Sequence, residues 1–86
     1  MGGWAYLNAI QNGQWDRFFQ KPVRIWVNGF AEQDVMGKVK SFEITAGKWI
    51  KGLVAREGEE QRVYVVTIVP ELPDSPYERW PYIQSG

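Results

Sequence analysis

The chain has 86 residues, which suits one domain with a small core, and 44% of them are hydrophobic, including five Trp, four Tyr and four Phe, as in a folded protein. Ten basic and ten acidic residues leave no net charge, which disfavours a duplex-DNA binder that neutralises many phosphates. His and Cys are both absent, which removes the commonest general base, nucleophile and metal ligands, so we expect no enzyme, no metal and no cofactor.

The composition also bears on the compartment. The absence of cysteine fits a reducing environment, and the first residues, MGGWAYLNAI, lack the basic start and the long apolar run of a signal peptide. No stretch approaches the roughly 20 apolar residues that cross a bilayer. We therefore expect a cytoplasmic protein with no membrane partner.

The first element in chain order is a helix at about residues 4–19, because apolar residues recur there at helical spacing. These residues are Trp4, Leu7, Ile10, Trp15, Phe18 and Phe19. Gly13 costs about 1 kcal/mol in a helix interior, so we expect a break there. Pro22 ends the segment, because the residue before a proline avoids the helical region.

Four strands are predicted next, at residues 23–27, 35–44, 48–55 and 62–69. The dipeptide Asn28-Gly29 is typical of a hairpin turn, and the charged residues 57–60 form a second turn. We interpret Gly37 as a bend within the long strand 35–44 rather than as a turn residue, because a glycine inside a strand often marks a tight bend of the sheet.

The last predicted strand differs from the others, because it is apolar at nearly every position. Both of its faces should be buried, one against the core of the domain and the other against a second chain. Four prolines from Pro70 onward then punctuate a tail that we expect to stay outside any sheet interior. The chain therefore divides into a domain at residues 1–70 and a proline-rich tail at residues 71–86.

Four short stretches carry a family resemblance: Leu7-Asn8-Ala9-Ile10, Pro22-Val23-Arg24-Ile25-Trp26-Val27-Asn28-Gly29, Gly37-Lys38-Val39-Lys40-Ser41-Phe42-Glu43 and Thr67-Ile68-Val69-Pro70. In order, they resemble the Leu-Asn-Ala-Leu, Pro-Val-x-Ile-Tyr-Leu-Val-Asn-Gly, Gly-x-Ile-x-Ser-Phe-Asp and Thr-Val-Val-Pro of Hfq-like proteins in the Sm-like superfamily. The chain departs from that pattern in a longer loop between Gly29 and Gly37, and in lacking the Tyr-Lys-His signature before the last strand.

The resemblance implies a mainly β fold, with an N-terminal helix followed by a small, strongly bent five-stranded Sm-like barrel. It also implies a homo-oligomeric ring, joined through the strand at residues 63–69, that binds single-stranded RNA by base stacking. Trp26 falls where the family stacks an adenine, and Asn28, Gly29 and Phe30 would line the same pocket. The other RNA-binding residues that we predict are Phe42, Lys40, Arg62 and Tyr64.

Structural roles remain open for the same residues. Trp26 would pack under the helix or the tail, Phe30 would cover the hairpin, and Phe42 would shape the barrel. The alternative function is a non-enzymatic protein-interaction or structural module that binds a peptide or assembles a particle. The tail, with its aromatic residues and prolines, either docks on its own domain or binds a protein partner.

Overall fold

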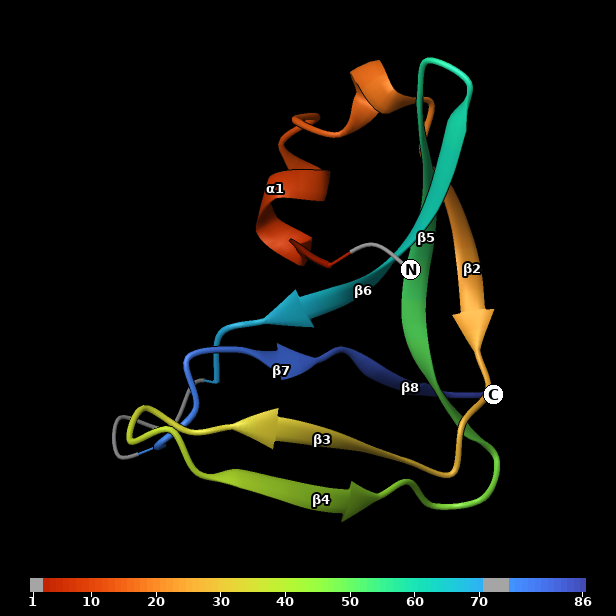
Figure 1. The fold of residues 1–86 in the computed structure, drawn as a ribbon. Coiled ribbons are helices and arrows are strands. Elements are labelled where there is room, and N and C mark those ends of the chain that lie inside the picture. The colour runs from red at the N-terminus through yellow and green to blue at the C-terminus, as the bar shows by residue number, and fades with distance from the viewer. Residues whose placement is uncertain (1–2, 71–74) are drawn as a thin grey trace.

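A computed structural model describes residues 3–70 and 75–86 (Figure 1). The chain begins with strand β1 (Trp4–Tyr6), which continues into a short helix α1 (Leu7–Gln11) and a single 3-10 turn η1 (Asp16–Phe18). The predicted helix at residues 4–19 is therefore wrong at its start. Residues 4–6 instead pair in parallel with a later strand and bury Ala5, which is 1% exposed. The predicted break is confirmed at Gly13, whose φ of +79° is unfavourable for any residue with a side chain.

The main sheet is built from strands β2 (Lys21–Ile25), β5 (Lys48–Glu57) and β6 (Glu60–Ile68), with β1 at its edge, in the order β1-β6-β5-β2. These strands confirm the predictions at residues 23–27, 48–55 and 62–69 to within two residues at each end. β2 begins at Lys21, and Pro22 is tolerated because β2 is an edge strand of this sheet.

A separate two-stranded sheet is formed by β3 (Gly29–Gln33) and β4 (Val39–Glu43). The interpretation of Gly37 as a bend inside one strand is wrong. Gly37 has a φ of +87° in the turn between β3 and β4, where Asp34 Oδ1 accepts hydrogen bonds of 2.9 Å from the backbone N–H groups of Met36 and Lys38. Gly29 is the first residue of β3 rather than part of a tight turn, because the loop after it forms a strand and pairs with β4.

The end of the chain joins the sheet, contrary to the prediction for the proline-rich tail. β7 (Trp80–Pro81) pairs with the end of β6, and β8 (Ile83–Ser85) pairs with the start of β5. Between them, the N–H of Tyr82 donates to Val66, and the carbonyl of Tyr82 accepts from Lys51. Bonded and non-bonded pairs alternate in an antiparallel ladder, so Pro81 lies at a position where its missing N–H costs no hydrogen bond.

Two clusters of apolar side chains hold this architecture together. The first, called the aliphatic core here, is made of Ala5, Leu53, Ala55 and Val66 and is covered by the N-terminal segment. The second, called the aromatic cluster, is made of Phe30, Phe42, Tyr77 and Trp80 and joins the β3–β4 hairpin to the C-terminal segment. The protein is a mainly β small domain with one short N-terminal helix and a strongly curled sheet that forms half a barrel (Figure 1).

Candidate nucleic-acid interface

The antiparallel pairing of β2 with β5 brings cationic and aromatic side chains to one face of the sheet. Arg24 lies directly opposite Lys51 in the register, so both side chains project from the same face. Trp26 comes directly after the end of β2, and its ring centroid lies 6.4 Å from that of Trp49, which is two residues before Lys51 on β5. These four residues, Arg24, Trp26, Trp49 and Lys51, are called the basic-aromatic patch below.

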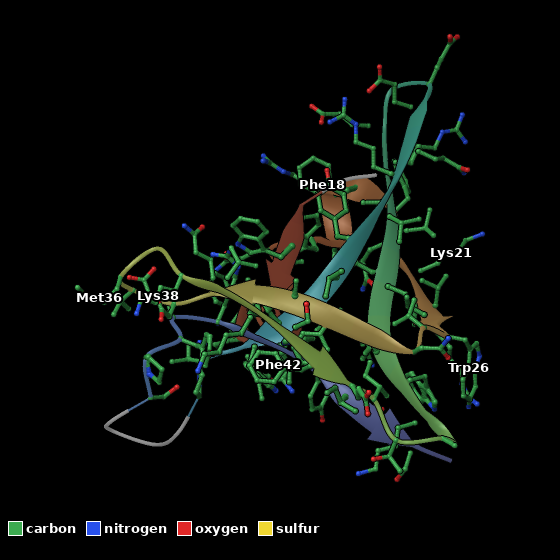
Figure 2. All side chains as sticks on the ribbon, turned by 60° about the horizontal axis from the view of Figure 1, so that its bottom comes forward. Phe18, Lys21, Trp26, Met36, Lys38 and Phe42 are labelled. Carbon is green, nitrogen blue, oxygen red and sulfur yellow. The ribbon has the colours of Figure 1, made fainter. Side chains whose placement is uncertain are left out.

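The two indoles of the patch differ in exposure. Trp49 is 9% exposed, and the guanidinium carbon of Arg24 lies 4.6 Å from the centroid of one of its rings. Trp26 is 58% exposed, and Figure 2 shows it projecting at the end of β2, away from Met36 and Lys38 at the other side of the view. Trp49 thus supports the patch from beneath, whereas Trp26 offers surface on which a planar group can stack.

Neither cation of the patch is in an ion pair with a side-chain carboxylate of the described residues. The ion pairs within residues 3–70 and 75–86 are Arg62–Glu60 and Arg79–Glu32. Arg24 donates one hydrogen bond of 3.2 Å, to the carbonyl of Gly86. Like charges directly opposite one another destabilise a sheet, so an anionic ligand would relieve an unfavourable pairing of Arg24 with Lys51.

The predicted RNA-binding residues are not brought together but lie in three places. Trp26 and Asn28 follow β2, and both are exposed. The backbone carbonyl of Asn28 accepts a hydrogen bond of 2.9 Å from Ile44, which fixes the start of the hairpin. Of the predicted residues, Trp26 alone belongs to the basic-aromatic patch.

A second group of predicted residues lies on the β3–β4 hairpin. Phe30 and Phe42 are cross-strand partners whose rings stack at 5.4 Å, and Trp80 contacts both rings edge-on at 5.0 and 4.8 Å. Gly29 approaches the carbonyl of Phe42 so closely that a Cβ there would lie 2.5 Å from the oxygen. Lys40 is exposed and lies opposite Glu32. The two phenylalanine rings thus have the structural role that the sequence left open, since they join the hairpin to the C-terminal segment.

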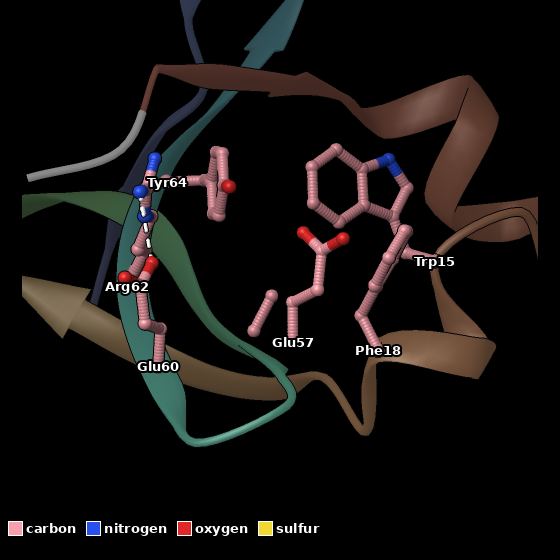
Figure 3. Close-up of a pocket in the computed structure, with 7 residues that line it drawn as sticks. Trp15, Phe18, Glu57, Glu60, Arg62 and Tyr64 are labelled. Carbon is pink, nitrogen blue, oxygen red and sulfur yellow. Dashed lines mark hydrogen bonds and ion pairs between the residues drawn. The ribbon is translucent and has the colours of Figure 1, made fainter.

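Arg62 and Tyr64 form the third group, on β6 (Figure 3). Arg62 donates a 2.9 Å hydrogen bond to Glu60 Oε2, and this bond raises the pKa of Arg62 above its ordinary value. Tyr64 is half-buried, and its ring meets Trp15 edge-on at 4.8 Å. These two residues face η1. They precede the segment at residues 67–70, which resembles the last motif of the family, by several residues along the chain.

The other three members of the patch, Arg24, Trp49 and Lys51, are not among the predicted RNA-binding residues. A usable signal existed in the period-two pattern of the strands, Arg24-x-Trp26 in one and Trp49-x-Lys51 in the other. What the sequence does not contain is the register, which decides whether these two pairs adjoin or lie apart.

The structure shows which role the tail has and which edges of β6 stay open to a second subunit. Of the two roles left open for the tail, docking on its own domain holds for residues 75–86, where Tyr77 and Trp80 join the aromatic cluster. The edges of β6 are occupied within the chain at residues 65–67 by β1, and at residues 67–68 by β7. A neighbouring subunit could therefore pair with β6 only along its earlier residues.

Comparisons with protein-family models, with curated proteins and with solved structures found no match to this chain. The resemblance to Hfq-like proteins therefore stays a prediction that rests on the four short motifs. Among the described residues, no helix has both the length and the apolar character needed to span a bilayer.

Proposed function

We propose that the protein binds single-stranded RNA through the basic-aromatic patch. The observation that carries the proposal is the junction of two cations and two indoles where the end of β2 lies beside β5, with neither cation in an ion pair with a described side-chain carboxylate. Stacking platforms combined with basic residues are the general solution for binding single strands without strict sequence readout. Base stacking on Trp26 and phosphate contacts from Arg24 and Lys51 make up the proposed mode of binding.

The expected strength of this contact is modest for one subunit. Stacking of a base on an aromatic side chain contributes about 1–3 kcal/mol, and two phosphate contacts add a salt-dependent term. Several patches linked in one assembly would raise the effective affinity without any new contact. The ring predicted from the family resemblance supplies such a repeat, and pairing of subunits through the free part of β6 is part of this proposal.

The proposal also includes the specific fold and family. A divergent Hfq-like relationship, with a five-stranded Sm-like barrel, is supported by the ordered motifs at residues 7–10, 22–29, 37–43 and 67–70. The short helix before a strongly curled sheet is consistent with it. Since β1 and β7 occupy the end of β6, ring closure would use residues 60–64 of that strand.

The test is a titration of labelled adenine-rich and uridine-rich RNA oligomers, with a DNA oligomer alongside, at two salt concentrations. We expect a shallow log-log salt slope of about 1.4 per subunit, from two phosphate contacts at roughly 0.7 each. Trp26→Ala should weaken binding by about 1–3 kcal/mol per engaged site. Its matched control is Phe19→Ala, because Phe19 is 75% exposed and precedes β2 rather than following it.

The cationic half of the patch has its own pair of variants. Arg24→Gln combined with Lys51→Gln should weaken the RNA complex and flatten the salt slope, because both phosphate contacts are lost. Lys38→Gln combined with Lys40→Gln makes the same change of charge on the exposed hairpin and should leave binding within about twofold. If the unaltered protein binds neither RNA oligomer at micromolar concentration in low salt, RNA binding is excluded.

A second candidate function, a protein-interaction module, is favoured by one observation. Val35, Met36 and Val39 are apolar and are 60%, 82% and 65% exposed around the turn of the β3–β4 hairpin. Exposed apolar residues that adjoin in this way often mark a protein contact. A raised ratio of absorbance at 260 to 280 nm in the purified protein would favour RNA binding. Capture of a specific protein by the unaltered chain, but not by a variant of Met36, would favour the interaction module.

A further inference from the structure

A small pocket lies between η1 and the hairpin that joins β5 to β6, away from the basic-aromatic patch. Its cavity volume is about 80 Å³. It is lined by Trp15, Phe18, Ala55, Glu57, Glu60, Arg62 and Tyr64. Such a space takes a small chemical head group and is too small for a nucleotide.

Three aromatic rings line this pocket, with Trp15 and Phe18 on one side and Tyr64 of β6 on the other (Figure 3). The Trp15 and Tyr64 rings meet edge-on at 4.8 Å, and those of Trp15 and Phe18 are tilted by 59° at 5.7 Å. The guanidinium carbon of Arg17 already lies 4.6 Å from the centroid of Phe18. The negative faces of such rings attract cations, most strongly when water is excluded.

The carboxylates of the pocket are not equivalent. Glu60 is paired with Arg62 at 2.9 Å, so its charge is compensated. Glu57 is in no ion pair with any of residues 3–70 or 75–86, and Figure 3 shows its carboxylate directed into the space beside the rings of Trp15 and Phe18. The pocket therefore combines π-faces with one carboxylate that is in no described ion pair, while the charge of Arg62, already paired with Glu60, acts on it from a longer distance.

We propose that this pocket binds a methylated ammonium group, such as the trimethylammonium of a modified lysine or of a free choline-like molecule. A methylated ammonium presents apolar methyl groups to the rings and a delocalised positive charge to Glu57. An unmodified lysine ammonium fits less well, because it is strongly hydrated and carries three N–H donors, whereas the acceptors of the described lining outside an ion pair are the Glu57 carboxylate and the Tyr64 hydroxyl.

The site is independent of the proposed RNA contact. Glu57 and Trp49 are at opposite ends of β5, and eight residues of strand at about 3.3 Å each separate them by roughly 26 Å. Loss of one function therefore leaves the other measurable. Trp15 and Phe18 come from the N-terminal segment, whereas Glu57 and Tyr64 come from β5 and β6, so the pocket exists only in the folded domain.

The experiment is a titration of the full chain followed by NMR of the tryptophan indole and backbone amide signals. The ligands are tetramethylammonium, choline, and short peptides containing trimethyllysine or unmodified lysine. The uncharged alcohol 3,3-dimethylbutanol, which has the shape of choline, separates the contribution of charge from that of shape. We expect millimolar or tighter binding of the methylated cations, with the alcohol and the unmodified peptide weaker by about tenfold.

Comparison of choline with the trimethyllysine peptide distinguishes a free small molecule from a modified protein as the source of the group. If the peptide binds at least about tenfold more tightly, neighbouring peptide contacts contribute and a modified protein is the ligand class. Equal affinities assign the site to the small molecule. Either result supports the pocket, because both require the trimethylammonium group.

Variants of the two adjacent hairpin glutamates supply the matched control. Glu57→Gln should weaken binding of tetramethylammonium by about tenfold, whereas Glu59→Gln, which makes the same change at an exposed residue outside the pocket lining, should have no effect. Phe18→Leu keeps apolar volume but removes one ring and should also weaken binding. Absence of any shift with tetramethylammonium in the folded protein, or equal effects of the two glutamate variants, would overturn the proposal.

Discussion

The aliphatic core and the aromatic cluster stabilise two halves of the molecule in different ways. The four core residues are at most 6% exposed and come from β1, β5 and β6. The four rings of the aromatic cluster are only half-buried, and they join a hairpin to the C-terminal segment through ring contacts of 4.8 to 5.7 Å. Burial of apolar area dominates the first, whereas ring geometry adds about 0.5–1.5 kcal/mol per pair in the second.

This difference suggests that the protein does not have the same stability throughout. The aliphatic core connects strands that also share long hydrogen-bonded ladders, such as the six paired positions of β5 and β6 from Gly52↔Val65 to Glu57↔Glu60. The β3–β4 hairpin forms its own sheet. We therefore expect the hairpin to open locally at a lower free energy than the main sheet. Three substitutions test this expectation, and a fourth tests backbone strain at a residue outside both clusters.

The largest effect is expected from Leu53→Ala in the aliphatic core. Leu53 is 1% exposed, and truncation of a buried leucine costs about 2–5 kcal/mol through lost burial and the cavity left behind. Denaturant unfolding of the whole protein should show a decrease of this size in the free energy of unfolding. The control is Val39→Ala, which removes apolar atoms at a side chain 65% exposed and should change stability little. An equal loss in both variants would contradict the division between core and surface.

Trp80→Ala should come next, because Trp80 contacts Phe30, Phe42 and Tyr77 in the aromatic cluster. We expect a loss of about 2–3 kcal/mol, below the range for a fully buried tryptophan since Trp80 is half-buried. Hydrogen exchange should accelerate most in residues 29–43. Trp26→Ala removes the same side chain at a position 58% exposed and outside the cluster. Uniform acceleration across β5 and β6 would show that the two clusters unfold as one unit.

Gly29→Ala probes the attachment of the hairpin without removing any ring. A Cβ at this position would lie 2.5 Å from the backbone oxygen of Phe42, so the two strands must move apart at a cost of about 1–2 kcal/mol. Thermal unfolding and hydrogen exchange should report destabilisation confined to the hairpin. The control is Gly3→Ala, because nothing lies within 4 Å of a Cβ built at Gly3. Equal stability of the two variants would show that the hairpin adapts freely.

The smallest effect is a gain in stability from Phe19→Gly. Phe19 has a φ of +52°, in the left-handed region where glycine is favoured by about 1 kcal/mol, and its side chain is 75% exposed. Comparison with Phe19→Ala isolates the backbone contribution, because both variants lose the ring. Phe19→Gly should unfold at a temperature several degrees higher than Phe19→Ala. A lower temperature for the glycine variant would show that the strain at this position is relieved in another way.

The sequence alone determined the local elements that rest on short-range patterns. Alternating apolar residues located β2, a nearly continuous apolar run located β6, and β5 was also predicted. The charged residues 57–60 located the turn between β5 and β6. The break at Gly13 was also predicted, because a glycine costs about 1 kcal/mol in a helix interior. Trp26 and Ile25 are consecutive, so the strand pattern puts them on opposite faces, and Trp26 is exposed in the structure.

Tertiary structure decided the features that depend on contacts between distant segments. Trp4 continues the helical spacing of Leu7 and Ile10, yet residues 4–6 form β1. Pairing with β6 buries Ala5 and supplies hydrogen bonds that the first residues of a helix lack. Residues 80–85 join the sheet in spite of Pro81, since the register puts this proline where no N–H is required. The basic-aromatic patch arises in the same way. Arg24-x-Trp26 and Trp49-x-Lys51 are visible in the sequence, but only the register of β2 with β5 makes them one surface, because a slip of one residue would turn one pair to the opposite face.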